Sequence, residues 1–114
     1  LQLMFLIVAK YLIPKGYRGM AVFPFVLMKY PSDKKNEVFI NHEKIHLRQQ
    51  IELLILPFFI WYLIEYVVRL FQYKNADLAY HNISFEREAY QNEANIDYLK
   101  NRPFFRFVQY LNYK

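Results

Sequence analysis

Residues 42–46 read His-Glu-Lys-Ile-His, and the interpretation of the whole chain depends on this stretch. On an α-helix, residues four apart lie one above the other, so His42 and His46 direct two imidazoles toward one point. Glu43 projects beside that point, where a carboxylate accepts a proton from a metal-bound water and does not ligate the metal. The pattern predicts two metal ligands and a general base. The plain alternative is a solvated helix face.

The composition indicates one domain with a surplus of apolar surface. A chain of 114 residues suffices for one hydrophobic core, so we expect a single domain over residues 1–114. Hydrophobic residues make up 55% of the chain and aromatic residues 20%, which is rich for a soluble protein of this size. The net charge of +5 is spread along the sequence without a Lys/Arg block or a nucleic-acid motif. We therefore expect an anionic membrane surface as a partner and no nucleic acid.

The N-terminal third predicts a β-hairpin. Residues 3–13 are apolar with β-branched and aromatic types, which favours a buried strand, with a short helix as the alternative. Residues 14–19 contain a proline and both glycines, so they predict a turn after which residues 20–30 return as a second strand. Pro24 has no N–H for a ladder, which places this strand at a sheet edge. A free edge can pair with a peptide substrate.

The motif lies in a predicted helix that begins after Asn36, a favourable N-cap residue, and runs from Glu37 to Leu56. Pro57 is expected to kink or restart this helix, and a second helical piece then reaches about Tyr73. Because the chain lacks cysteine, any metal in this region has histidine and carboxylate ligands.

Residues 53–64 form a run without any charge, bracketed by Glu52 and Glu65. The run is shorter than the ~20 residues that cross a bilayer, yet it is apolar on every face of a helix. Glu65 and Arg69 are four apart and are expected to pair, which extends the apolar segment to residues 53–71. We expect lipid, a partner protein or a second copy of the chain to cover this segment, with an ordinary core helix as the alternative. The expected location is membrane-associated, in a compartment that the sequence leaves open.

Residues 72–83 are read as a polar connection, followed by a helix from Ser84, as N-cap, to about Lys100. A short C-terminal helix over residues 104–110 carries an apolar docking stripe of Phe104, Phe107 and Val108. These elements predict an α+β, mainly α fold. It consists of an N-terminal β-hairpin, a long kinked helix with the motif, a second helix with a third ligand, and the C-terminal helix.

The third ligand comes from one face of the helix that begins near Ser84. This face is formed by Glu86, Ala89, Tyr90, Glu93 and Asp97. The small side chain of Ala89 allows the motif helix to approach closely, and Glu86 then completes a His2Glu site with an open fourth position. That arrangement is typical of catalytic zinc. The alternative for Glu86 is a surface carboxylate.

Two segments resemble small zincin-type metallopeptidase domains of the gluzincin group. Residues 42–50, HEKIHLRQQ, are similar to the HExxHxxQQ helix of that group, and residues 85–89, FEREA, are similar to its downstream E-x-x-A segment. The resemblance covers about residues 36–93. Many relatives have an acidic residue after the alanine that orients a ligand histidine, whereas this chain has Tyr90. The resemblance implies Zn2+ as cofactor, with His42, His46 and Glu86 as its ligands and Glu43 as general base.

The function expected from these residues is zinc-dependent hydrolysis of peptide bonds in a peptide or protein substrate. A neutral donor is needed for the developing oxyanion. Gln49 and Gln50, one turn beyond His46, either orient a ligand or cap a polar face. Two alternatives remain, namely a membrane-associated adaptor subunit of a larger complex and a metal-binding protein without turnover. Candidates for the oxyanion donor are Tyr90, Tyr80 and His81, the last of which is also an alternative ligand.

Overall fold

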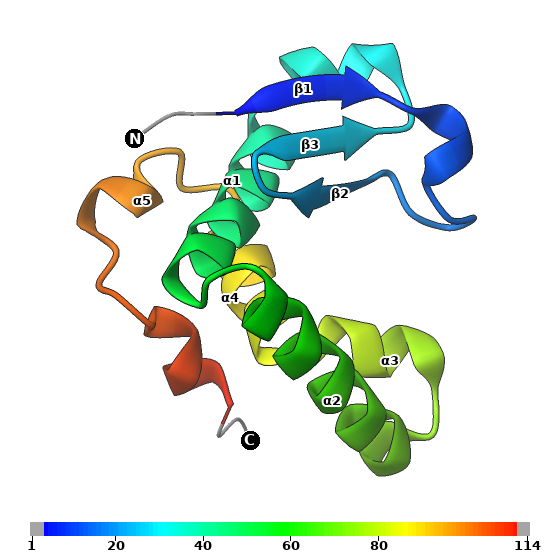
Figure 1. Cartoon of the computed structure of the whole chain (residues 1–114), viewed down its shortest axis with the longest axis vertical. Coiled ribbons are helices and arrows are strands. Elements are labelled where there is room, and N and C mark those ends of the chain that lie inside the picture. The colour runs from blue at the N-terminus through cyan, green and yellow to red at the C-terminus, as the bar shows by residue number, and fades with distance from the viewer. Residues whose placement is uncertain (1–3, 112–114) are drawn as a thin grey trace.

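The computed structural model describes residues 4–111, in which a small N-terminal sheet is followed by helices (Figure 1). This confirms the expected α+β, mainly α fold. Short 3-10 helices, η1 (Lys10–Leu12), η2 (Pro31–Lys35) and η3 (Arg106–Tyr110), join or follow the main elements. The strands and α-helices are β1 (Phe5–Val8), β2 (Gly19–Val22), β3 (Phe25–Met28), α1 (Glu37–Glu52), α2 (Leu56–Tyr73), α3 (Ala76–His81), α4 (Ser84–Asn92) and α5 (Tyr98–Asn101).

The sheet has the strand order β1-β3-β2, with β1 parallel and β2 antiparallel to β3. Residues 3–13 and 20–30 therefore do pair, but in parallel, so the predicted hairpin between them is wrong. The hairpin that is present joins β2 to β3. Residues 20–30 are long enough to fold back on themselves, and a cis peptide bond joins Phe23 to Pro24 in the turn between β2 and β3. Pro24 thus lies in a turn, where it needs no ladder partner, and not within an edge strand. Leu3 lies outside the described residues.

Helix α1 begins as predicted, because the Asn36 side chain accepts a hydrogen bond of 3.1 Å from the Phe39 backbone N–H. The helix ends at Glu52, earlier than expected. Leu54 and Ile55 adopt positive φ angles of 63° and 60°, which reverse the chain before α2. Pro57 is tolerated in the first turn of α2, where its missing N–H has no helical partner. The expected kink is thus a complete break, with 112° between α1 and α2.

The second half of the chain packs α2, α4 and η3 around a buried aromatic cluster of Phe58, Ile83, Phe85 and Phe107. Residues 72–83 are not merely a polar connection, because they contain α3, whose N-terminus is capped by Asn75. Helix α4 stops at Asn92 and not near Lys100, which leaves Asp97 exposed at the start of α5. Of the C-terminal stripe, Phe107 is buried, whereas Phe104 and Val108 are exposed.

No single helix within residues 4–111 is both long and apolar enough to cross a bilayer. The bent pair of α1 and α2 meets the requirements of length and composition when the two helices are taken together.

Candidate metal centre

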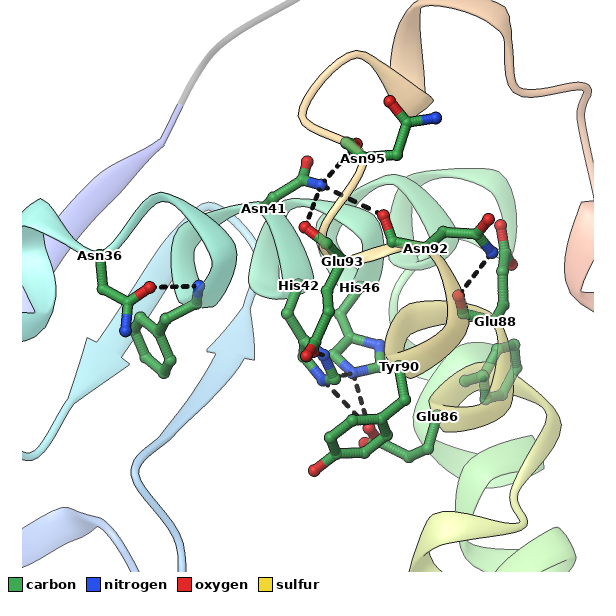
Figure 2. Close-up of polar contacts among 12 residues, drawn as sticks. Asn36, Asn41, His42, His46, Glu86, Glu88, Tyr90, Asn92, Glu93 and Asn95 are labelled. Atoms are coloured by element: carbon green, nitrogen blue, oxygen red, sulfur yellow. Dashed lines mark hydrogen bonds and ion pairs between the residues drawn. The ribbon is translucent and has the colours of Figure 1, made fainter.

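The site lies where α4 crosses α1 (Figure 2). Glu65 of α2 fixes the start of α4, because its carboxylate accepts hydrogen bonds from the Ser84 backbone N–H (2.6 Å) and hydroxyl (2.7 Å). This contact satisfies donors that a helix N-terminus leaves unpaired. Glu86 then lies in the first turn of α4, and Ala89, one turn later, is completely buried. Glu65 also pairs with Arg69 at 3.2 Å, as predicted.

The three predicted ligands, His42, His46 and Glu86, come together in this crossing and are all buried. Glu86 Oε1 lies 3.2 Å from His42 Nε2 and 3.0 Å from His46 Nε2, and the two Nε2 atoms are 3.2 Å apart. Tetrahedral coordination with bonds of about 2.0–2.1 Å separates ligand atoms by about 3.3–3.4 Å. The observed triangle therefore fits a small tetrahedral cation after shifts of a few tenths of an ångström.

Hydrogen bonds fix which nitrogen of His46 faces the centre. The Gln49 Nε2 group donates to Phe85 O (3.2 Å) and Glu88 Oε1 (3.0 Å), both of which are acceptors, so its Oε1 must face His46. This oxygen lies 2.8 Å from His46 Nδ1, which therefore carries a proton. His46 Nε2 is left to bind a metal or a second proton. Gln49 thus orients the ring of His46, a predicted ligand.

Glu93 has the same role for His42, and sequence reasoning missed it. Its Oε1 lies 2.7 Å from His42 Nδ1, which directs His42 Nε2 at the centre. A carboxylate behind a ligand histidine fixes the ring and raises its basicity. The acidic residue that the resemblance expects directly after Ala89 is therefore supplied from one turn later in the chain. The available signal was the position of Glu93 on the same helical face as Glu86.

Glu43 lies beside the three ligands without belonging to their group. Its side chain is buried, and its Oε1 atom has no hydrogen-bond partner among the described residues. Burial raises the pKa of Glu43, an effect that the nearby His46 and His42 partly oppose. A buried carboxylate of raised pKa with a free oxygen matches the requirements for a general base.

Tyrosines surround the centre. Tyr62 of α2, missed by sequence reasoning, donates a 2.7 Å hydrogen bond to Glu86 Oε2 and so leaves Oε1 for the histidines. The Tyr90 ring packs edge-on against His42 with centroids 4.5 Å apart, and burial raises its pKa to about 12. Its hydroxyl lies 3.4 Å from the Tyr80 hydroxyl. The exposed His81 stacks on Tyr90 and lies outside the ligand group, so the structure gives no support to His81 as a ligand.

Two cavities meet at Glu43 and Tyr80. An apolar cavity of about 470 Å³ extends from Glu43 and His46 past Phe59, Tyr62 and Leu63 of α2. A more polar cavity of about 520 Å³ lies on the side of His42 and includes residues 15–19. The two cavities share Tyr17, Gly19, Glu43 and Tyr80 in their linings, so they adjoin at the candidate centre beside the edge strand β2. We call this pair of adjoining cavities the passage.

Gln50 closes part of this edge of β2, a role that the sequence did not indicate. Its side-chain amide donates to Ala21 O and accepts from Phe23 N, both at 2.7 Å. In an antiparallel pair, alternate residues turn both backbone groups away from the partner strand. The Ala21 N–H therefore points to the same side as Ala21 O, toward the cavity that Ala21 and Gly19 line.

Protonation competes with metal binding at this centre. Burial lowers the pKa of His46, but the Glu86 carboxylate outweighs this effect and raises the pKa to about 9. Glu86 correspondingly has a pKa well below its ordinary value, because His46 and His42 outweigh the opposing effect of burial. In the metal-free protein at neutral pH, His46 Nε2 thus holds a proton that faces Glu86.

We expect zinc affinity to rise with pH, because this His46 proton must leave before the metal binds. Well below pH 9 the apparent affinity should fall about tenfold per pH unit, and the fall between pH 9 and pH 7 should be about 50-fold. Competition with a chromophoric chelator across this range measures the effect, after correction for the chelator's own protonation. A flat profile would show that no proton is displaced.

Comparison with protein-family models, curated proteins and solved structures finds no match to this chain.

Proposed function

We propose that the protein is a zinc-dependent metallopeptidase of the gluzincin type, with His42, His46 and Glu86 as zinc ligands. One observation carries the proposal, namely that three candidate ligand atoms converge within 3.0–3.2 Å beside a buried carboxylate oxygen that has no hydrogen-bond partner within residues 4–111. A purely structural cluster would leave neither a free base nor cavities on both sides of it. Zinc binding without turnover remains the second candidate.

The roles of the protein groups follow from their positions. Bound zinc would supply Lewis acidity and acidify a water molecule. Glu43 accepts the proton of the attacking water and returns it to the leaving amine, for which its unpartnered oxygen and raised pKa are suited. Glu93 and Gln49 hold the two histidines in position. Of the three donors considered from sequence, Tyr80 lines both cavities, and burial raises its pKa, so it is a neutral donor within the passage. Tyr90 stays a second candidate.

A peptide substrate would lie in the passage beside β2. The Ala21 N–H is available to pair with an extended chain, as in recognition by strand addition. The Gln50 side chain already forms hydrogen bonds with Ala21 O and Phe23 N, so a substrate cannot pair with β2 beyond the Ala21 N–H. The apolar cavity next to His46 would receive an apolar substrate side chain.

Metal content and peptide cleavage test the proposal together. We expect about one zinc per chain in wild type and almost none in His46→Ala, because a tetrahedral site with one water loses one of three protein ligands. Element analysis after gel filtration measures both proteins. Wild type should also cleave unstructured peptides, and a chelator should stop the cleavage. Equal and negligible zinc in both proteins would refute the metal centre, whereas bound zinc without cleavage would favour the second candidate.

A further inference from the structure

Helix α2 has its charges inside and its aliphatic side chains outside. Glu65 and Arg69, the only ionised side chains of α2, are 6% and 8% exposed, and they contact Ser84 and the backbone of Leu111. On the opposite side, Leu63 and Phe71 are 63% and 79% exposed. A surface helix in water has the reverse arrangement. The exposed apolar residues of this outer face are Leu56, Ile60, Leu63, Ile64, Val67, Val68 and Phe71.

The chemistry of this outer face favours lipid over a protein partner. Its seven side chains offer no hydrogen-bond donor or acceptor, whereas a protein interface of standard size carries about ten direct hydrogen bonds and is enriched in Tyr, Trp and Arg. Trp61, Tyr62 and Tyr66, which have polar tips, are only partly exposed and are not among these seven. The exposed Gln72 and Tyr73 lie at the C-terminal end of α2. The acyl chains of a lipid layer form no hydrogen bonds, and the side chains of the outer face have no hydrogen-bonding groups that such a layer would leave unpaired.

The charge distribution favours an anionic layer. Most acidic side chains are used inside the protein, at the candidate centre or in ion pairs. Among residues 4–111, the exposed acidic residues are Glu37, Asp77 and Asp97. The exposed basic residues are Lys10, Lys15, Arg18, Lys34, Lys35, Lys74 and Lys100. Exposed basic side chains thus outnumber exposed acidic ones by seven to three, and anionic lipid attracts each cation that comes near it.

A second apolar projection lies across the apolar cavity from α2. Tyr11 is 94% exposed, and Leu12 beside it is exposed too, between the exposed Lys10 and Lys15. The cavity is lined by Pro14 and Tyr17 of the chain that follows and by Leu63 and Tyr66 of α2. Apolar and aromatic side chains with lysines beside them are typical of a membrane interface.

We infer that the outer face of α2 and the tip at Tyr11 and Leu12 dock on an anionic lipid bilayer, with α2 in the membrane plane. Helix α2 packs on α3 (Figure 1), and its Phe58 belongs to the buried aromatic cluster, so the helix cannot cross the bilayer without taking these elements with it. Docked in this way, the apolar cavity opens toward the lipid. The docking itself does not depend on the proposed function.

A matched pair of variants tests the docking. Ile64 on the outer face and Ile96 between α4 and α5 are 60% and 48% exposed, so Ile64→Glu and Ile96→Glu make the same change at two similarly exposed sites. We expect wild type and Ile96→Glu to float with phosphatidylcholine vesicles that contain phosphatidylglycerol, and to bind pure phosphatidylcholine at least about tenfold more weakly. Ile64→Glu should bind the anionic vesicles at least about tenfold more weakly than Ile96→Glu.

The single tryptophan, Trp61, gives a second readout because it lies on α2 in the groove with Ile60 and Ile64. Brominated lipid should quench Trp61 fluorescence in wild type and in Ile96→Glu, and much less in Ile64→Glu. Circular dichroism establishes that both variants are folded. Equal binding of the two variants, or no binding of wild type to either vesicle, would overturn the proposal. A dimer in detergent-free buffer that Ile64→Glu dissociates would also overturn it and assign the face to a second copy.

Discussion

The Glu43→Gln variant is expected to keep its zinc and to lose peptide-bond hydrolysis by roughly 100- to 10,000-fold, the range that general-base assistance contributes. Glutamine has the shape of glutamate but cannot accept the proton of the attacking water. The ligand atoms of His42, His46 and Glu86 meet without Glu43, so the metal site should persist. Initial rates on a quenched fluorescent peptide, together with zinc content by element analysis, measure both properties in the same sample.

Glu37→Gln provides the matched control. Glu37 lies in the first turn of the same helix, is exposed and lines neither cavity at the centre, so the same chemical change there should leave the rate within about twofold. Loss of zinc from Glu43→Gln would identify Glu43 as a ligand and overturn its role as base. A zinc-loaded Glu43→Gln protein as active as wild type would place the base elsewhere. Accumulation of uncleaved partner in cells with Glu43→Gln, and not with Glu37→Gln, would identify a membrane-proximal substrate.

The ligand set was accessible from sequence because it depends on local geometry. The spacing of His42 and His46 fixes their common direction once a helix is assumed, and the helix itself is indicated by Asn36 at its start. Glu86 required one further step, a packed crossing of two helices, for which the small Ala89 was the signal. The structure brings these three residues together as the spacing predicts.

The supporting residues were not accessible in this way. Glu93 was placed on the correct face, but its contact with His42 depends on the angle between α1 and α4, which no local pattern contains. Tyr62 lies within the uncharged run of residues 53–64, and no residue near it in sequence suggests a partner for its hydroxyl. The partner, Glu86, lies beside Tyr62 only in the folded chain. The prediction of the N-terminal strand pairing was wrong for a related reason. Pro14–Gly19 and Phe23–Pro24 are both turn signals, and the strand order depends on long-range pairing that neither signal contains.

Arg102 joins three parts of the chain that sequence reasoning treated separately. Its side chain is fully buried, with Nη1 2.6 Å from Glu52 Oε2 at the end of α1 and Nη2 3.1 Å from Glu88 Oε1 on α4. Its Nε also donates to Glu88, and Tyr98 donates to Glu88 from α5 at 2.6 Å. Because Glu88 in turn accepts from Gln49, which orients His46, this network connects the C-terminal segment to the candidate metal centre.

The Arg102→Met variant is therefore expected to lose about 3–5 kcal/mol of unfolding free energy, the cost of leaving buried charges without their partner. Methionine fills much of the volume but neutralises neither Glu52 nor Glu88. For a chain of this length the loss corresponds to a melting temperature lower by roughly 10–20 °C. Lys100→Met is the control, because Lys100 forms an exposed pair with Asp97 and its removal should cost no more than about 0.5 kcal/mol. Adding Glu88→Gln to Arg102→Met should recover part of the loss, since it removes one of the two stranded charges. Chemical denaturation of the four proteins measures these differences, and equal stability of Arg102→Met and Lys100→Met would show that the buried network contributes nothing to the fold.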